Sequence, residues 1–192
     1  GYKVEWLNAA EVHKIEPRVS PATVGALHVE GGKDVEPYRL TLALAEAAEK
    51  MGVTIRTGRV TNLQRKRSAI SGVFIGSELL ATDRVVLAMG PWSATIEEWT
   101  GVKVPIRPLK GQIIRLRAPG EPYVYSIGHQ KNYAMTKPSD DLVWCGTTEE
   151  NAGFDESKTV ESRDKIIDST VLMLPSLVDA DLVLQTACLR PV

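Results

Sequence analysis

The sequence predicts an α+β fold, in which a largely antiparallel, twisted sheet with flanking helices is joined to part of an α/β unit. Two segments, 36–51 and 157–174, have apolar residues at the three-to-four-residue spacing of amphipathic helices. Beyond residue 104 the remaining segments are mostly strand-like, with short turns between them. One earlier run, Arg84–Ala88, is apolar enough to be a strand buried on both faces, which is typical of a parallel sheet.

A short helix is expected near the N-terminus. Asn8 and Glu11 have the spacing of a capping box, in which a side-chain acceptor and a carboxylate three residues later satisfy each other's backbone donors. The helix should run to about Ile15, because Pro17 cannot continue it. A strand is expected at 22–29, followed by a glycine-rich turn.

The 36–51 helix has the clearest boundaries of any predicted element. Pro37 lies in its first turn, where the missing proline N–H has no helical partner to lose. Gly52 follows the last apolar position and suits the left-handed conformation that ends many helices.

Strands are predicted on both sides of a glycine turn in the middle of the chain. Gly90 interrupts the apolar run and should open a helix that continues to about Thr100. The helix at 157–174 is ended by Pro175. The predicted strands are 53–56, 59–64, 69–75, 78–82, 84–88, 104–117, 123–127, 132–137, 142–146 and 181–189.

These elements suggest two domains. A substrate-side sheet domain should comprise residues 1–35 and 107–189, and residues 36–106 should be a partial α/β unit. The sheet is expected to combine the segments around 24–29, 107–117, 123–137, 142–146 and 181–189, with the 157–174 helix on one face. The α/β unit should combine the 36–51 helix with strands 53–56 and 84–88. We expect it to expose apolar edges that favour self-association.

Composition excludes several functional classes. The chain has 192 residues, 43% of them hydrophobic, 24% charged, and a net charge of -1. This near-neutral, interleaved charge offers no basic field for nucleic acid or anionic lipid. No apolar run approaches the ~18 residues of a membrane-spanning helix. The first residues contain neither an initiator Met nor a secretory or transit pattern, so we expect an internal piece of a longer protein.

Cysteine and histidine are too sparse to define a site. Cys145 and Cys188 both lie in strand-like apolar stretches, so free buried thiols in a reducing, cytoplasmic compartment are expected. The three histidines are scattered and have no ligand at zinc-binding spacing, so no metal site is predicted. Glu149 and Glu150 are adjacent, and their side chains should diverge in an extended chain rather than form a catalytic carboxylate pair.

The Gly90 turn is the first segment of the chain that could form part of a ligand-binding site. A buried strand runs into glycine and a helix then opens, so a ligand could approach the backbone closely. On geometry alone, an ordinary strand-to-helix turn, with glycine chosen only for its dihedral angles, is the better explanation. The chain contains neither a GxGxxG motif nor a P-loop and therefore has no dinucleotide fingerprint of its own.

Five motifs occur in order along nearly the whole chain. They are Asp34–Pro37 with Met51–Ile55, Ala88–Ser93, Val104–Gln112, Gly146–Glu149 with Gly153–Asp155, and Leu189–Pro191. Together they resemble the middle of flavoproteins in the D-amino-acid oxidase, glycine oxidase and sarcosine oxidase superfamily. By that resemblance, the family's glycine fingerprint would precede residue 1 and its closing flavin-lining segment would follow Val192. Met89 departs from the commoner Thr or Ser, which puts a hydroxyl contact in doubt.

The resemblance implies an FAD cofactor and names its contacts. Val60 should offer backbone to the adenosine part of FAD, and Ala88, Gly90 and Trp92 should approach the cofactor from the adjoining turn. Because the pyrophosphate-binding unit is missing, this chain alone is expected to bind FAD weakly or not at all and to be inactive.

The resemblance also implies a substrate site without a catalytic acid or base. Arg190 matches the arginine that binds a substrate carboxylate, and Tyr133 matches a strand tyrosine whose hydroxyl adds a second contact. The implied reaction oxidises a small amine or amino acid by hydride transfer to the flavin. Two alternatives stay open: an FAD enzyme similar to glycerol-3-phosphate dehydrogenase, and a non-catalytic sheet domain that binds a ligand or partner.

Overall fold

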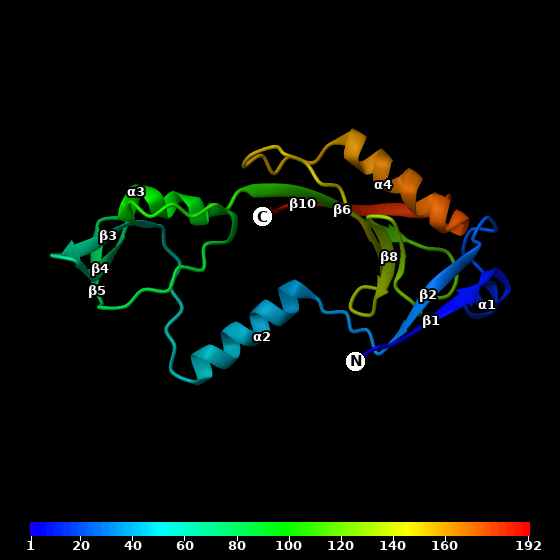
Figure 1. Cartoon of the computed structure of the whole chain (residues 1–192), viewed down its shortest axis with the longest axis horizontal. Coiled ribbons are helices and arrows are strands. Elements are labelled where there is room, and N and C mark those ends of the chain that lie inside the picture. The colour runs from blue at the N-terminus through cyan, green and yellow to red at the C-terminus, as the bar shows by residue number, and fades with distance from the viewer. The chain divides into compact units, whose positions relative to one another are not determined.

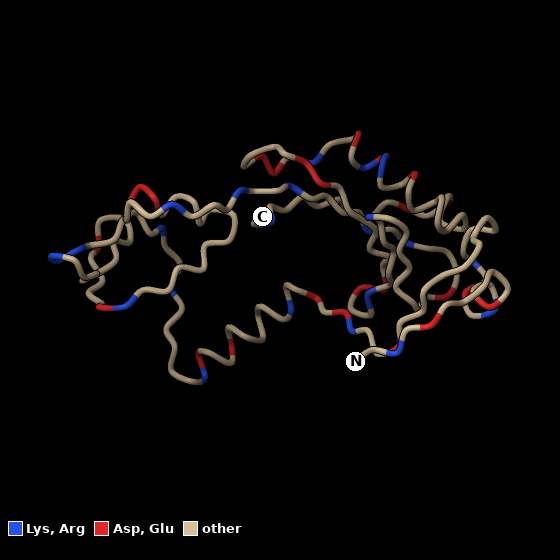
Figure 2. Tube along the Cα trace, in the orientation of Figure 1, with Lys and Arg blue, Asp and Glu red and all other residues tan.

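The computed structural model describes all 192 residues (Figure 1). The chain divides into two compact units: residues 1–34 with 109–189 form the first, and residues 35–108 with 190–192 form the second. None of the helices combines the length and the apolar character that crossing a membrane requires. Lys and Arg are interspersed with Asp and Glu along both units (Figure 2).

The first unit is built on a five-stranded sheet with the order β10-β6-β9-β8-β7. Its strands are β6 Pro108–Arg117, β7 Ile127–His129, β8 Asn132–Lys137, β9 Leu142–Gly146 and β10 Asp181–Pro191. The pairs β6–β9, β9–β8 and β8–β7 are all antiparallel, which confirms the predicted sheet type. The predicted strands at 132–137 and 142–146 are confirmed with their bounds, whereas 123–127 is wrong because pairing begins only at Ile127.

The helix α4, Val160–Met173, lies along this sheet (Figure 1). Its buried residue Ile166 belongs to the same core cluster as Ile114, Ala134 and Cys145. These three sheet residues are partners across β6, β9 and β8 and therefore share one face. The opposite face carries the next row, Ile113, Gly146 and Tyr133. The predicted packing of the 157–174 helix on one face of the sheet is confirmed.

A second, two-stranded sheet contains the N-terminal segment. It pairs β1 Lys3–Asn8 with β2 Gly25–Glu30, and α1 Ala9–Ile15 connects the two strands. The predicted capping box is present: Glu11 N donates to Asn8 Oδ1 at 3.1 Å, and Asn8 N donates to Glu11 Oε2 at 2.8 Å. The prediction that 24–29 joins the main sheet is wrong, because this segment pairs with β1, which the sequence did not indicate as a strand.

The second unit contains a three-stranded antiparallel sheet, β3-β4-β5, and the helices α2 and α3. The bounds are α2 Pro37–Lys50, β3 Val60–Lys66, β4 Ala69–Ile75, β5 Glu78–Ala81 and α3 Ile96–Thr100, with 3-10 turns at Gly90–Thr95 and, in the first unit, Pro175–Leu177. The predicted hairpin and the start of the 36–51 helix at Pro37 are confirmed, and Gly52 has φ +92°.

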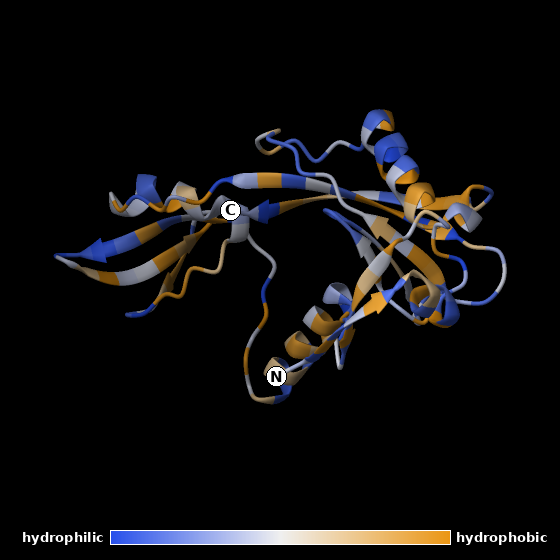
Figure 3. Ribbon diagram, turned by 45° about the vertical axis from the view of Figure 1, so that its right-hand side comes forward, coloured by the Kyte–Doolittle hydropathy of each residue, from blue (hydrophilic) through white to orange (hydrophobic).

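Two predicted strands of the α/β unit do not form. Residues 53–56 and 84–88 pair with no strand of this chain, and Val86 is 92% exposed rather than buried. The helix α2 buries none of its residues, and Figure 3 shows apolar residues along it. A strand needs a neighbour for its backbone hydrogen bonds, and these segments have none within the chain. The apolar surface expected of an incomplete α/β unit is therefore exposed.

Candidate functional site

Tyr133 lies on the sheet face opposite to α4, where a glycine makes room for it. Its Cα partner on β9 is Gly146, whose own partner on β6 is Ile113. A Cβ added at Gly146 would lie 2.6 Å from Ile113 Cγ2 and 3.4 Å from the Tyr133 hydroxyl oxygen. Gly146 therefore lets the tyrosine hydroxyl lie directly over the β9 backbone.

In the next row of this face, the Arg115 side chain on β6 stacks on the indole of its β9 partner Trp144. The Arg115 guanidinium lies 3.8 Å from the centroid of the Trp144 ring, and the Lys137 ammonium lies 5.9 Å from the same centroid. Trp144 Nε1 donates to Asp140 Oδ2 at 3.1 Å, which fixes the indole. Asp140 also lies 3.5 Å from the Arg115 guanidinium, so the positive charge beside the indole is balanced by this carboxylate.

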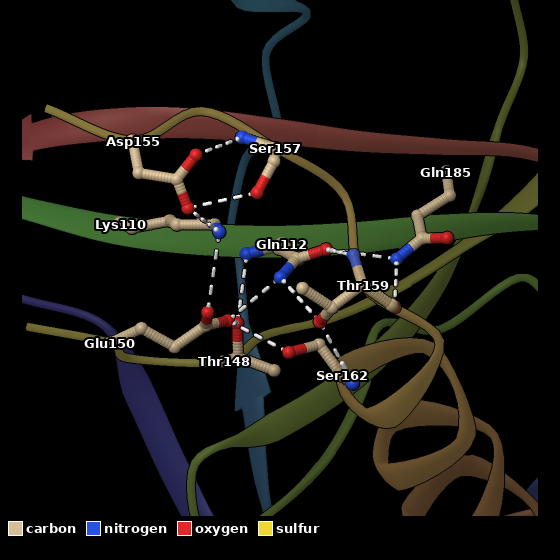
Figure 4. A network of polar contacts seen from close by, with 9 residues as sticks. All are labelled: Lys110, Gln112, Thr148, Glu150, Asp155, Ser157, Thr159, Ser162 and Gln185. Atoms are coloured by element: carbon tan, nitrogen blue, oxygen red, sulfur yellow. Dashed lines mark hydrogen bonds and ion pairs between the residues drawn. The ribbon is translucent and has the colours of Figure 1, made fainter. Parts of the chain in front are cut away.

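A network of polar side chains occupies the α4 side of the same sheet (Figure 4). At its centre the Lys110 side chain is only 1% exposed, with its ammonium 3.0 Å from Asp155 Oδ2 and 3.6 Å from Glu150 Oε2. The hydrogen bond to Asp155 holds the pKa of Lys110 above its ordinary value despite burial. Hydrogen bonds from the backbone N–H of Ser157 and from Lys110 lower the pKa of Asp155 to about 2.

Gln112 connects three elements within this network. Its Nε2 donates to Glu150 Oε1 at 2.9 Å, and its Oε1 accepts from the backbone N–H of Thr159 at 3.1 Å and from Gln185 Nε2 at 2.8 Å. Thr159 is the N-cap of α4 and accepts from Ser162 N at 3.3 Å. Through Gln112, β6 is therefore bonded to the start of α4 and to β10 (Figure 4).

Glu150 is the main acceptor of the network. Burial raises the pKa of Glu150, but hydrogen bonds from Thr148, Gln112 and Ser162 outweigh it, and the net pKa is lowered. Its neighbour Glu149 instead meets Lys131 at 2.7 Å near the surface. The prediction that these two acids diverge is confirmed, but the role of Glu150 as the acceptor at the centre of a polar network was not predicted.

The residues predicted to contact the cofactor all lie in the second unit. Gly90 has φ +54°, and no heavy atom lies within 4 Å of a Cβ added there. Its carbonyl accepts from Ser93 Oγ at 2.7 Å, and Trp92 N donates to Met89 O at 3.1 Å, so the turn is internally braced. Trp92, Ala88 and Val60 are exposed. An open backbone beside exposed side chains fits a bound ligand.

Arg190 lies near the end of β10 and is half-buried. Beyond it, Val192 and Arg107 form a reciprocal backbone pair, with N–O distances of 3.0 and 2.8 Å. Arg190 belongs to the second unit and Tyr133 to the first, so their joint role stays a prediction.

Two other features of the first unit are alternatives to this site. Glu5, His28 and Glu30 lie close enough to hold a metal ion, but Lys3 is 2.7 Å from Glu30 and 3.8 Å from Glu5 and already balances them. A cavity of about 1160 Å³ lies against β2, and its lining includes Trp6, Tyr125, Ile127 and Met173. It includes none of the predicted site residues.

The two cysteines differ in environment. Burial raises the pKa of Cys145 to about 11, which leaves it an unreactive thiol at neutral pH. Both cysteines are free, but only Cys145 is buried. The expectation of a buried thiol is therefore wrong for Cys188, which lies on the half-exposed strand β10.

Comparison with known proteins identifies the family. A family model described as DAO, FAD dependent oxidoreductase, matches residues 1–192, so the chain belongs to this family of flavoproteins. It is 32% identical over 192 residues to hydrogen cyanide synthase subunit HcnC of Pseudomonas aeruginosa, covering 98% of this chain and 46% of that protein. It is 29% identical over 177 residues to glycine oxidase of Pseudomonas putida, covering 91% and 48%.

Solved structures show the same fold. Glycine oxidase from Geobacillus kaustophilus matches with a TM-score of 0.91 at 24% identity, over 100% of this chain and 52% of that one. Iminodiacetate oxidase from Chelativorans sp. BNC1 matches with a TM-score of 0.89 at 25% identity, over 98% and 52%. The chain thus spans about half the length of the relatives that it matches.

Proposed function

We propose that this chain is part of an FAD-dependent enzyme that oxidises a small amine or amino acid carrying a free carboxylate. In this proposal residues 1–35 and 107–189 form the substrate-side domain, and residues 36–106 form the middle of the FAD domain. The enzyme would act in the cytoplasm. The observation that carries the proposal is the family match over residues 1–192, together with relatives that include glycine oxidases.

Arg190 would bind the substrate carboxylate and Tyr133 would add a second hydrogen bond to it. Gln185 and Arg190 are five residues apart on β10, so the two-residue period of a strand turns their side chains to opposite sides of that strand. Tyr133 lies on the sheet face away from α4. A planar guanidinium offers two parallel N–H donors, which suits a carboxylate better than a single charge does.

FAD would supply the acceptor for the hydride that leaves the substrate α-carbon. The exposed backbone at Gly90, with Ala88, Trp92 and Val60, would lie against the cofactor. The contribution of Arg190 and Tyr133 would be to hold the α-carbon in one orientation. No side chain of this chain is assigned a proton transfer.

The test uses the full-length protein that contains this chain. Replacing Arg190 by Ala leaves a carboxylate without its charged partner, at a cost of about 2–5 kcal/mol. At about 1.4 kcal/mol per decade, kcat/KM should fall roughly 30- to several-thousand-fold. Arg190→Lys should recover part of the loss, because an ammonium cannot reproduce the two-pronged contact.

Further measurements distinguish a loss of substrate binding from a loss of flavin, and the proposed function from its two alternatives. Tyr133→Phe should cost about 1–2 kcal/mol, mostly in KM, and flavin content should be unchanged in all three variants. If Arg190→Ala keeps wild-type kcat/KM for every amino acid oxidised, the carboxylate assignment is wrong. Activity on glycerol 3-phosphate alone would support the phosphate-substrate alternative, and a full-length protein without flavin would support a non-catalytic binding domain.

A further inference from the structure

The apolar residues of β10 do little to fix its register. β10 lies at the edge of the sheet and pairs only with β6. Its consecutive residues Leu182, Val183 and Leu184 are exposed to nearly the same extent, 41%, 42% and 39%. A strand with one buried face cannot slip without exposing it, but a strand with two similar faces lacks that constraint. Backbone hydrogen bonds, including the reciprocal pair of Arg107 and Val192 at the far end of the strand, distinguish registers less sharply than a side chain does, because a slipped strand can re-form most of them.

The side chain of Gln185 makes specific hydrogen bonds that select one register of β10. Its Nε2 donates to Gln112 Oε1 at 2.8 Å and to the backbone carbonyl of Thr159 at 2.8 Å (Figure 4). Both acceptors are held in place: Gln112 is completely buried and bonded to Glu150, and Thr159 is the N-cap of α4. A slip by two residues would move this amide roughly 6.6 Å and break both bonds, and a slip by one would turn it to the other face.

The register of β10 also determines where Arg190 lies, because Arg190 is on the same strand five residues beyond Gln185. Each residue of slip moves the Cα atom of Arg190 by roughly 3.3 Å along the strand, whereas a binding group must be held within about 0.5 Å of its productive position. We propose that Gln185 is a positioning residue, which fixes the register of β10 through Gln112 and Thr159 and thereby aligns Arg190 with the substrate carboxylate. This inference rests on the proposed function, in which Arg190 binds that carboxylate.

The test compares three variants of the full-length, FAD-loaded protein. Gln185→Leu keeps the approximate size but removes both donors. Gln185→Lys restores donors, because an ammonium can donate to the Gln112 and Thr159 oxygens at once. Ile166→Val is the matched control, since it loosens the α4 core and leaves both acceptors of Gln185 in place. The probes are acetate, which carries a carboxylate, and acetamide, its neutral analogue, each followed by the perturbation of flavin absorbance.

We expect Gln185→Leu to weaken acetate binding about 10- to 100-fold and to leave acetamide binding unchanged. Gln185→Lys should return acetate affinity to within about threefold of wild type, and Ile166→Val should not change it. Amide hydrogen exchange over residues 181–191 should accelerate in Gln185→Leu and recover in Gln185→Lys. This second measurement reports the register without depending on substrate.

Several results would overturn the inference. Wild-type acetate affinity in Gln185→Leu, no recovery in Gln185→Lys, or an equal loss in Ile166→Val would each show that Gln185 does not position Arg190. The Arg190→Ala variant distinguishes a failure of the Gln185 positioning role from a failure of the proposed function. If Arg190→Ala leaves acetate affinity unchanged, Arg190 is not the carboxylate site, and both the proposed function and the positioning role fail, even where hydrogen exchange shows that Gln185 holds β10.

Discussion

Glu150→Ala should destabilise the protein far more than the same change at its neighbour. Glu150 accepts from Gln112 and Ser162 at 2.9 Å each and faces the Lys110 ammonium at 3.6 Å. Its side chain is 27% exposed, so water replaces only part of what is lost. Lys110 keeps its partner Asp155, but Thr148, Gln112 and Ser162 all lose the oxygen to which they donate. At about 1–3 kcal/mol for each buried donor left without an acceptor, the loss should total about 3–5 kcal/mol.

Thermal and urea unfolding, followed by tryptophan fluorescence, measure this loss. For a protein of this size each kcal/mol lowers Tm by about 2–4 °C, so Glu150→Ala should lower it by about 6–20 °C. Glu149→Ala is the control: Glu149 is 40% exposed and pairs with the exposed Lys131, which predicts a loss of at most about 1 kcal/mol. Equal losses at the two positions would refute the role assigned to the network.

Four further outcomes follow from the same structure. The stability advantage of wild type over Asp155→Asn should persist above about pH 4 and vanish as the pH falls toward 2, because the folded pKa of Asp155 is depressed to about 2 from an ordinary 3.8; an advantage independent of pH would contradict this. Gly146→Ala should cost about 1–3 kcal/mol in urea unfolding, since its Cβ would meet Ile113, and a neutral effect would show that the row relaxes freely. The 192-residue chain purified alone should be colourless and inactive, and stoichiometric flavin in its absorbance spectrum would disprove that. Light scattering should show that the chain self-associates through the exposed apolar residues of α2, and a strict monomer at high concentration would contradict this.

Local signals in the sequence predicted the elements whose boundaries depend on neighbouring residues. The capping box of Asn8 and Glu11, the proline at the start of α2 and the strand at 142–146 were all readable in this way. Pairing was harder, because it depends on distant partners. The segment 24–29 resembles any other strand, and only the structure shows that it pairs with β1 instead of joining the main sheet.

The residues of the candidate site also differ in how far the sequence predicts them. Arg190 and Tyr133 were identified from family motifs, and neither carries a local sign of its role. Lys110 was missed because a lysine in a strand is usually exposed, and its burial depends on acids 40 and 45 residues away. The available signal was the alternation of Ile114 and Leu116 with Arg115 and Arg117, since a two-residue period extended backward places Gln112 and Lys110 on the apolar side of the strand, where the structure buries them.

We propose that this chain belongs to an enzyme in which Arg190 presents an amino-acid carboxylate to FAD. The most direct test adds small amino acids, glycine first, to the full-length protein without oxygen and follows the flavin absorbance. We predict that an amino acid bleaches the flavin of the wild-type protein, and that Arg190→Ala, with the same flavin content, bleaches roughly 30- to several-thousand-fold more slowly at low substrate concentration. A flavin that no amino acid bleaches but glycerol 3-phosphate does, or equal bleaching in wild type and Arg190→Ala, would contradict it.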